Sequence, residues 1–134
     1  MSKMKKLAAV AAAAIMAVSA MAVSASAQTV YTEYVNTSCG TYRGGLTINN
    51  YSNYKQVDAV TMVANGSFST VGAVLFIFDG STGQQLYYND QTNNNASFAS
   101  VSASSGNLDP VSTQSHHIAT CGSSTWSRML TLRG

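Results

Sequence analysis

The fold is decided by a stretch that reads Val71-Gly72-Ala73-Val74-Leu75-Phe76-Ile77-Phe78, then Asp79-Gly80-Ser81-Thr82-Gly83, then Gln84-Gln85-Leu86-Tyr87-Tyr88. Its first part is apolar, rich in β-branched and aromatic residues and too short to span a membrane, so it predicts a strand buried on both faces. Asp79 and the two glycines after it predict a tight reversal, because an aspartate side chain bonds to nearby backbone and glycine readily adopts positive φ. The stretch therefore predicts a β-hairpin at the centre of the domain.

Short β-rich segments separated by Gly, Asn and Ser continue on both sides of this hairpin. Strands are expected at residues 30–35, 46–48, 55–64, 96–103, 115–121 and 125–132, and polar loops at 89–95 and 104–110. The first of these strands is expected at a sheet edge. Because no segment has a convincing helical period and turns recur about every ten residues, the sequence predicts an all-β fold, an antiparallel β-sandwich of about 7–9 strands with one disulfide.

The N-terminus has the pattern of a secretory signal peptide. Lysines among residues 3–6 precede an apolar run at 7–18, and small residues lead to Ala25-Ser26-Ala27. Cleavage is expected after Ala27, which would leave one secreted, extracellular domain at residues 28–134. A retained membrane anchor is disfavoured, because serines interrupt the run before it reaches the roughly 20 apolar residues that cross a bilayer.

The chain that follows the expected cleavage point is nearly neutral. It holds four basic and five acidic side chains, which gives a formal net charge of −1. Nucleic acid and anionic membranes are therefore not expected as partners, since both are bound through clusters of Lys and Arg. Its surface is expected to consist mainly of Ser, Thr, Asn, Gln and Gly.

Two cysteines, Cys39 and Cys121, lie near opposite ends of this domain. Export permits oxidation, so a disulfide between them is expected. Closing so long a loop would stabilise the fold by about 4 to 5 kcal/mol in the chain-entropy description. Two free thiols or an intermolecular bridge are the alternatives, and a catalytic thiol is disfavoured because no C-x-x-C pair is present.

Catalytic and metal-ligating patterns are weak. The adjacent pair His116-His117 points to opposite faces of any strand, so both rings cannot ligate one metal ion without a bulge. Asp79 and Asp109 look like turn residues rather than paired catalytic carboxylates. No G-x-S-x-G motif frames any serine. The sequence predicts neither an enzyme nor a bound metal or cofactor.

Tyrosines offer the best functional signal. Tyr51 and Tyr54 flank Ser52-Asn53, and Tyr87 and Tyr88 precede Asn89-Asp90. Aromatic rings beside amide groups can stack on a sugar ring and bond to its hydroxyls. Since neighbouring strand residues alternate between faces, only one of Tyr87 and Tyr88 is expected to face solvent. The alternative is that these tyrosines simply favour strands and cover sheet edges.

Taken together, these patterns favour a secreted, non-catalytic β-sandwich that binds a neutral extracellular ligand such as a glycan or another cell-surface component. Two alternatives stay open. One is a bacteriocin-like or envelope-active secreted protein. The other is a matrix protein that associates with itself through sheet edges.

Overall fold

The computed structural model describes residues 26–134, and every regular element in that part of the chain is a β-strand. The strands are β1 (Ser26–Tyr31), β2 (Val35–Asn36), β3 (Gly40–Asn50), β4 (Lys55–Gly66), β5 (Thr70–Asp79), β6 (Gln85–Asn94), β7 (Phe98–Gly106), β8 (Val111–Cys121) and β9 (Ser124–Arg133). The expected signal peptide lies almost wholly outside the described residues and stays a prediction. Its expected cleavage point, after Ala27, falls within β1.

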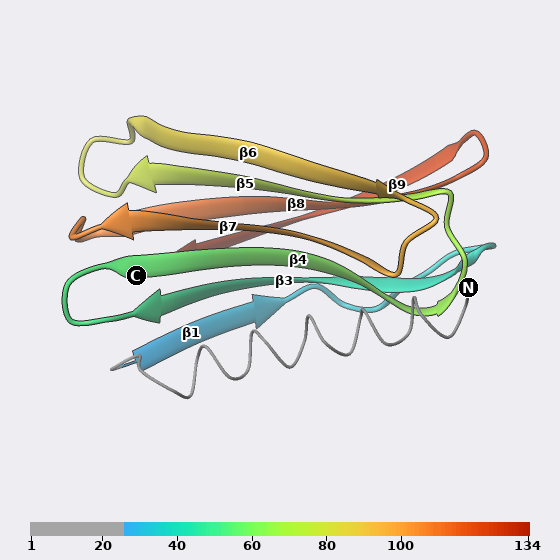
Figure 1. Cartoon of the computed structure of the whole chain (residues 1–134), viewed down its shortest axis with the longest axis horizontal. Helices are drawn as coiled ribbons and strands as arrows, with labels where there is room; N and C mark the ends of the chain where they lie inside the picture. Colours follow the sequence, from blue (N-terminus) through green and yellow to red (C-terminus); the bar gives the residue numbers. More distant parts are fainter. Residues whose placement is uncertain (1–25) are drawn as a thin grey trace.

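The strands form two antiparallel sheets that pack face to face. One sheet has the order β1-β3-β4-β7, with β2 also paired to β3, and the other has the order β6-β5-β8-β9. Figure 1 shows β6, β5 and β8 above β4, β3 and β1. The predicted all-β sandwich with one disulfide is confirmed.

The main hydrophobic core fills the space between the two sheets. Its buried side chains come from β3, β4, β5, β7 and β8, and they are Leu46, Ile48, Val57, Ala59, Ala73, Leu75, Ile77, Ala99, Val101 and Val111. In β5 the buried residues alternate with residues that point outward, as expected for a strand with one face on the core. The prediction that this strand is buried on both faces is wrong, because Phe76 and Phe78 lie half-buried on the outer face.

A second, smaller core lies at the end of the sandwich where β4 leads into β5. The Tyr42 ring meets Phe68 edge-on at 5.8 Å between centroids, and Phe68 meets Trp126 in the same way at 6.2 Å. Cys39 and Cys121 pack against this core and form the disulfide, with their Cα atoms 6.4 Å apart. The predicted pairing is confirmed, and the bond joins the start of β3 to the end of β8.

The β5–β6 hairpin forms as predicted. Its two glycines, Gly80 and Gly83, are required for different reasons. Asp79 Oδ1 accepts hydrogen bonds from the backbone N–H groups of Ser81 at 2.8 Å and Thr82 at 3.3 Å. Gly83 has a positive φ of 76°. At Gly80 the requirement is space, because a Cβ there would lie 2.7 Å from the carbonyl oxygen of Pro110.

Several expected boundaries are wrong, and β3 and β8 begin earlier than expected, at Gly40 and Val111. The stretch 89–95, expected as a loop, belongs mostly to β6, which is polar because it is an exposed edge strand. The expected strand 30–35 is divided at Thr32, whose N–H donates to the Gly44 carbonyl at 2.9 Å, so that β1 and β2 pair in succession with β3. Strand β7 runs on to Gly106, into the segment expected as a loop.

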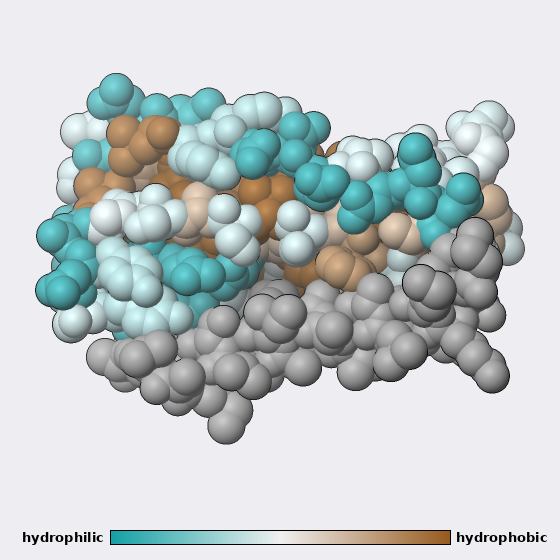
Figure 2. All heavy atoms as spheres, in the orientation of Figure 1, coloured by the Kyte–Doolittle hydropathy of each residue, from teal (hydrophilic) through white to brown (hydrophobic). Residues whose placement is uncertain are grey.

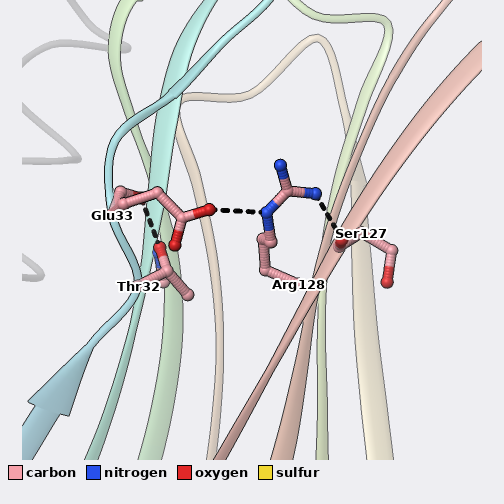
Figure 3. Close-up of polar contacts among 5 residues, drawn as sticks. Thr32, Glu33, Ser127 and Arg128 are labelled. Carbon is pink, nitrogen blue, oxygen red and sulfur yellow. Dashed lines mark hydrogen bonds and ion pairs between the residues drawn. The ribbon is translucent and has the colours of Figure 1, made fainter.

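A surface ion pair ties the two sheets together along one side. Arg128 Nε on β9 donates to Glu33 Oε1, in the segment between β1 and β2, at 2.7 Å (Figure 3). Arg128 Nη1 also donates to the Ser127 carbonyl, and Thr32 Oγ1 donates to the Glu33 carbonyl. The guanidinium lowers the pKa of the Glu33 carboxyl. This contact spans the gap between the edge strands of the two sheets.

Candidate ligand-binding surface

An aromatic cluster lies on the outer face of the four-stranded sheet, and Phe76 is at its centre. The ring of Phe76 lies 5.0 Å from that of Tyr88, 5.6 Å from that of His116 and 6.1 Å from that of Phe78, measured between centroids. Three adjacent strands, β6, β5 and β8, supply these four side chains. We call Phe76, Phe78, Tyr88 and His116 the outer aromatic surface.

Alternation along the strands explains why these rings gather. Phe76 and Phe78 are two positions apart on β5, so they share a face. The register places Tyr88 directly opposite Phe76 on β6, and His116 opposite Val74 on β8. Aromatic cross-strand neighbours of this kind stabilise a sheet and hold one another in place. The surface is therefore built on regular strands rather than on loops.

The outer aromatic surface is open to solvent. Tyr88 exposes 52% of its surface, and Leu86 on the same strand and Met129, which is in register with His116 on β9, are about as exposed. Figure 2 shows a hydrophobic patch at its upper left, over the hairpin end of β6. A group of exposed large apolar side chains on a small protein commonly marks a binding site.

Polar groups border the aromatic rings. Gln114 of β8 is in register with Phe76, and Asp90 of β6 is in register with Val74. The Gln114 amide Nε2 lies 2.7 Å from the sulfur of Met129, so this amide is held next to the apolar surface. Rings, an amide and a carboxylate on one face can bind a molecule that has both apolar faces and hydroxyl groups.

Of the four tyrosines predicted to bind a ligand, Tyr88 belongs to this surface. Tyr87 points the other way, is half-buried and packs against the main core. The prediction that only one of this pair faces solvent is confirmed. Tyr87 therefore acts as a core residue of the edge strand.

Tyr51 and Tyr54 stack on each other at the turn between β3 and β4. Their ring centroids are 4.6 Å apart with an interplanar angle of 13°, and the Tyr51 N–H donates to the Tyr54 carbonyl at 2.9 Å. Desolvation raises the pKa of Tyr51. This turn belongs to the five-stranded sheet, although it lies at the same end of the sandwich as the β5–β6 hairpin (Figure 1). The structure therefore separates the two predicted tyrosine pairs between two sheets.

A third aromatic group, which sequence reasoning missed, surrounds Arg43 on the outer face of the five-stranded sheet. The guanidinium carbon lies 3.8 Å from the ring centroid of Tyr31 and 4.9 Å from that of Tyr34. Arg43 Nη1 also donates to the Tyr34 hydroxyl at 3.0 Å. These rings are occupied by the cation, which makes the cluster a cation–π contact between β1, β3 and the segment after β1.

The histidine pair divides between the two faces of β8, as predicted. His117 is fully buried between the sheets, whereas His116 joins the outer aromatic surface. His117 Nδ1 lies 2.9 Å from Thr61 Oγ1 on β4, and Nε2 lies 2.7 Å from Ser115 Oγ. Since the Thr61 hydroxyl donates to the Gly72 carbonyl at 2.7 Å, we assign the imidazole proton to Nδ1.

Burial decides what this histidine can do. Desolvation, with the nearby His116 charge second, lowers the pKa of His117 to about 4. A neutral ring that is hydrogen-bonded at both nitrogens and closed off from solvent has no access to a substrate. His117 therefore links the two sheets through Thr61.

Within residues 26–134 no group of three His, Cys, Asp or Glu side chains is arranged to hold a metal ion. The described part of the chain also contains no helix that is long and apolar enough to cross a membrane. In comparisons with known proteins, no family, no curated sequence and no solved structure matches this chain.

Proposed function

We propose that this protein is a secreted, non-catalytic β-sandwich that binds a neutral extracellular ligand, a glycan or another hydroxyl-rich cell-surface component. The observation that carries the proposal is the gathering of Phe78, Tyr88 and His116 around Phe76 on an exposed sheet face.

The chemistry of the surface supports a ligand of this class. The C–H faces of a sugar ring are apolar and pack on aromatic rings, while its hydroxyls bond to side chains such as Gln114 and Asp90 at the border. The chain beyond Ala27 has a formal net charge of −1, so long-range attraction to a charged polymer contributes little.

Rigidity supports the same conclusion. The four rings project from paired strands and contact one another, so few rotamers are lost on binding. A site on regular strands holds its side chains in a more precise geometry than a site on flexible loops does. Phe76, at the centre of the cluster, and the exposed Tyr88 in contact with it are expected to contribute most of the affinity.

The proposal is tested with a panel of soluble glycans and insoluble polysaccharides. The oxidised secreted chain is compared with Tyr88→Ala, which removes an exposed ring of the outer aromatic surface, and with Tyr54→Ala, which removes an exposed ring from the other sheet. Binding that needs Tyr88 and not Tyr54 supports the proposal. Absence of binding throughout the panel contradicts it and favours a bacteriocin-like or envelope-active protein, or a matrix protein that associates with itself.

A further inference from the structure

Strand β6 forms one edge of the four-stranded sheet, and apart from a β-bulge at its hairpin end it carries little protection against pairing with another strand. Its ten residues, QLYYNDQTNN, contain no lysine, arginine or proline, and Asp90 is its one charged residue. Nearly all of its side chains are exposed. By contrast β9, at the opposite edge, carries Arg128 and Arg133. Proteins usually blunt free edges with such charges or with proline.

Two hydrogen bonds show which backbone groups face the free side. The Asn95 N–H donates to the carbonyl of Ser69, which directly precedes β5, at 2.8 Å. Because hydrogen-bonded pairs alternate along antiparallel strands, the backbone groups of the odd-numbered residues of β6 point toward β5. The Asp90 N–H instead faces the free side, where it donates to Oδ1 of its neighbour Asn89 at 2.9 Å, a local bond that pairing with another strand would replace. The N–H and C=O groups of Tyr88, Asp90 and Thr92 therefore point away from the sheet.

We propose that the free edge of β6 pairs antiparallel with β6 of a second copy of this chain. The two four-stranded sheets then become one continuous eight-stranded sheet related by a two-fold axis. Main-chain hydrogen bonds supply the affinity, and the exposed amides of Gln85, Asn89 and Gln91 add side-chain bonds across the junction.

The single charge selects the register. Only outward-facing residues can form hydrogen-bonded pairs with each other, and two such registers overlap more of the strand than any other. One sets Asp90 opposite its own copy and is disfavoured by repulsion between like charges. The other register sets Asp90 of each copy opposite Tyr88 of the other copy, and the two Asn89 residues opposite each other. We assign this register because it keeps the two carboxylates apart.

This pairing would also extend the outer aromatic surface. The side chains of Tyr88 and Phe76 lie on the outer face, and a two-fold axis perpendicular to the sheet keeps that face on the same side in both copies. A dimer would thus present two aromatic surfaces side by side to one long ligand. Dimerisation itself does not depend on the ligand, so the two proposals fail independently.

The test uses proline at position 92, because the Thr92 N–H is not needed for pairing with β5. Wild-type protein is expected to sediment as a dimer at high concentration, Thr92→Pro as a monomer with a similar melting temperature, and Thr92→Ala, which keeps the N–H, as a dimer. A monomeric wild type, or a dimeric Thr92→Pro variant, overturns the proposal.

A disulfide experiment tests the register and serves even if Thr92→Pro folds poorly. In the assigned register the two copies of residue 89 form a non-hydrogen-bonded pair, close enough for a disulfide. Oxidised Asn89→Cys should therefore migrate as a covalent dimer on a non-reducing gel. Gln91→Cys, on the same face of the strand, should stay a monomer because its copies are too far apart. Cross-linking of Gln91→Cys but not Asn89→Cys contradicts the register, and cross-linking of neither contradicts the pairing.

Discussion

Gly44 of β3 and His117 of β8 face each other across the interior so closely that a Cβ on residue 44 would lie 2.1 Å from Cγ of the imidazole. The absence of a side chain on one sheet makes room for the histidine of the other. The same ring is hydrogen-bonded to Thr61 and Ser115. The packing of the two sheets at this point therefore depends on a glycine and a histidine together.

Replacing this glycine should destabilise the fold. Gly44→Ala puts a methyl group into the space of a buried ring, and overpacking of this kind costs about 1 to 3 kcal/mol of unfolding free energy. Denaturation in urea measures the loss. Gly45→Ala is a matched control, because a Cβ there would lie 3.1 Å from the half-exposed ring of Tyr31 on the outer face, not against a buried ring. Equal stability of Gly44→Ala and wild type would contradict the described packing.

Stability should fall in mild acid because of His117. Its pKa is about 4 in the folded state against an ordinary 6.5, so the folded state takes up this proton less readily than the unfolded state. The stabilisation from the neutral ring is complete above about pH 6.5 and is lost as the pH falls toward 4, by about 3 kcal/mol in total.

Unfolding free energies measured in urea across this pH range test that expectation. His117→Gln lacks the titrating group and should show a flatter profile, while His116→Gln, on the outer face, should retain most of the wild-type slope. If wild type and His117→Gln lose stability in parallel, other groups control the acid response.

Loss of the disulfide should be costly. Cys39 and Cys121 are separated by 82 positions, so the bond restricts a long loop in the unfolded chain. Cys39→Ser/Cys121→Ser is expected to lose about 4 to 5 kcal/mol of unfolding free energy in the chain-entropy description. Urea denaturation under non-reducing conditions measures the difference. A change of less than about 1 kcal/mol would mean that strain in the native state offsets most of the loop entropy.

The sequence predicted the architecture well where the local signals were strong. The central hairpin could be predicted because an apolar β-branched run precedes Asp79-Gly80. The disulfide could be predicted because the expected secreted domain contains two cysteines. Strand β6 was only partly recognised. Its second half is polar because it forms a sheet edge with both faces largely exposed, and such a strand resembles a loop in composition.

The candidate surface was predicted only in part. The sequence indicates Tyr88, but it predicts Phe76 and Phe78 to be buried, because a run that is apolar at every position does not reveal which face is covered. His116 could be placed opposite His117 but not beside Phe76, since that contact depends on the register between β5 and β8. The Gly44–His117 contact depends on how the sheets face each other, which no local pattern records.

The most direct test of the proposed binding site is calorimetry with one glycan selected from the panel. Its affinity is measured for wild type, Tyr88→Ala and Tyr88→Phe, together with the melting temperature of each protein. We expect saturable binding by the wild type, at least about a tenfold weaker affinity for Tyr88→Ala, and near-normal affinity for Tyr88→Phe, which keeps the stacking ring. Equal affinity of Tyr88→Ala and wild type, or loss of binding on Tyr54→Ala instead, would contradict a binding site on the outer aromatic surface.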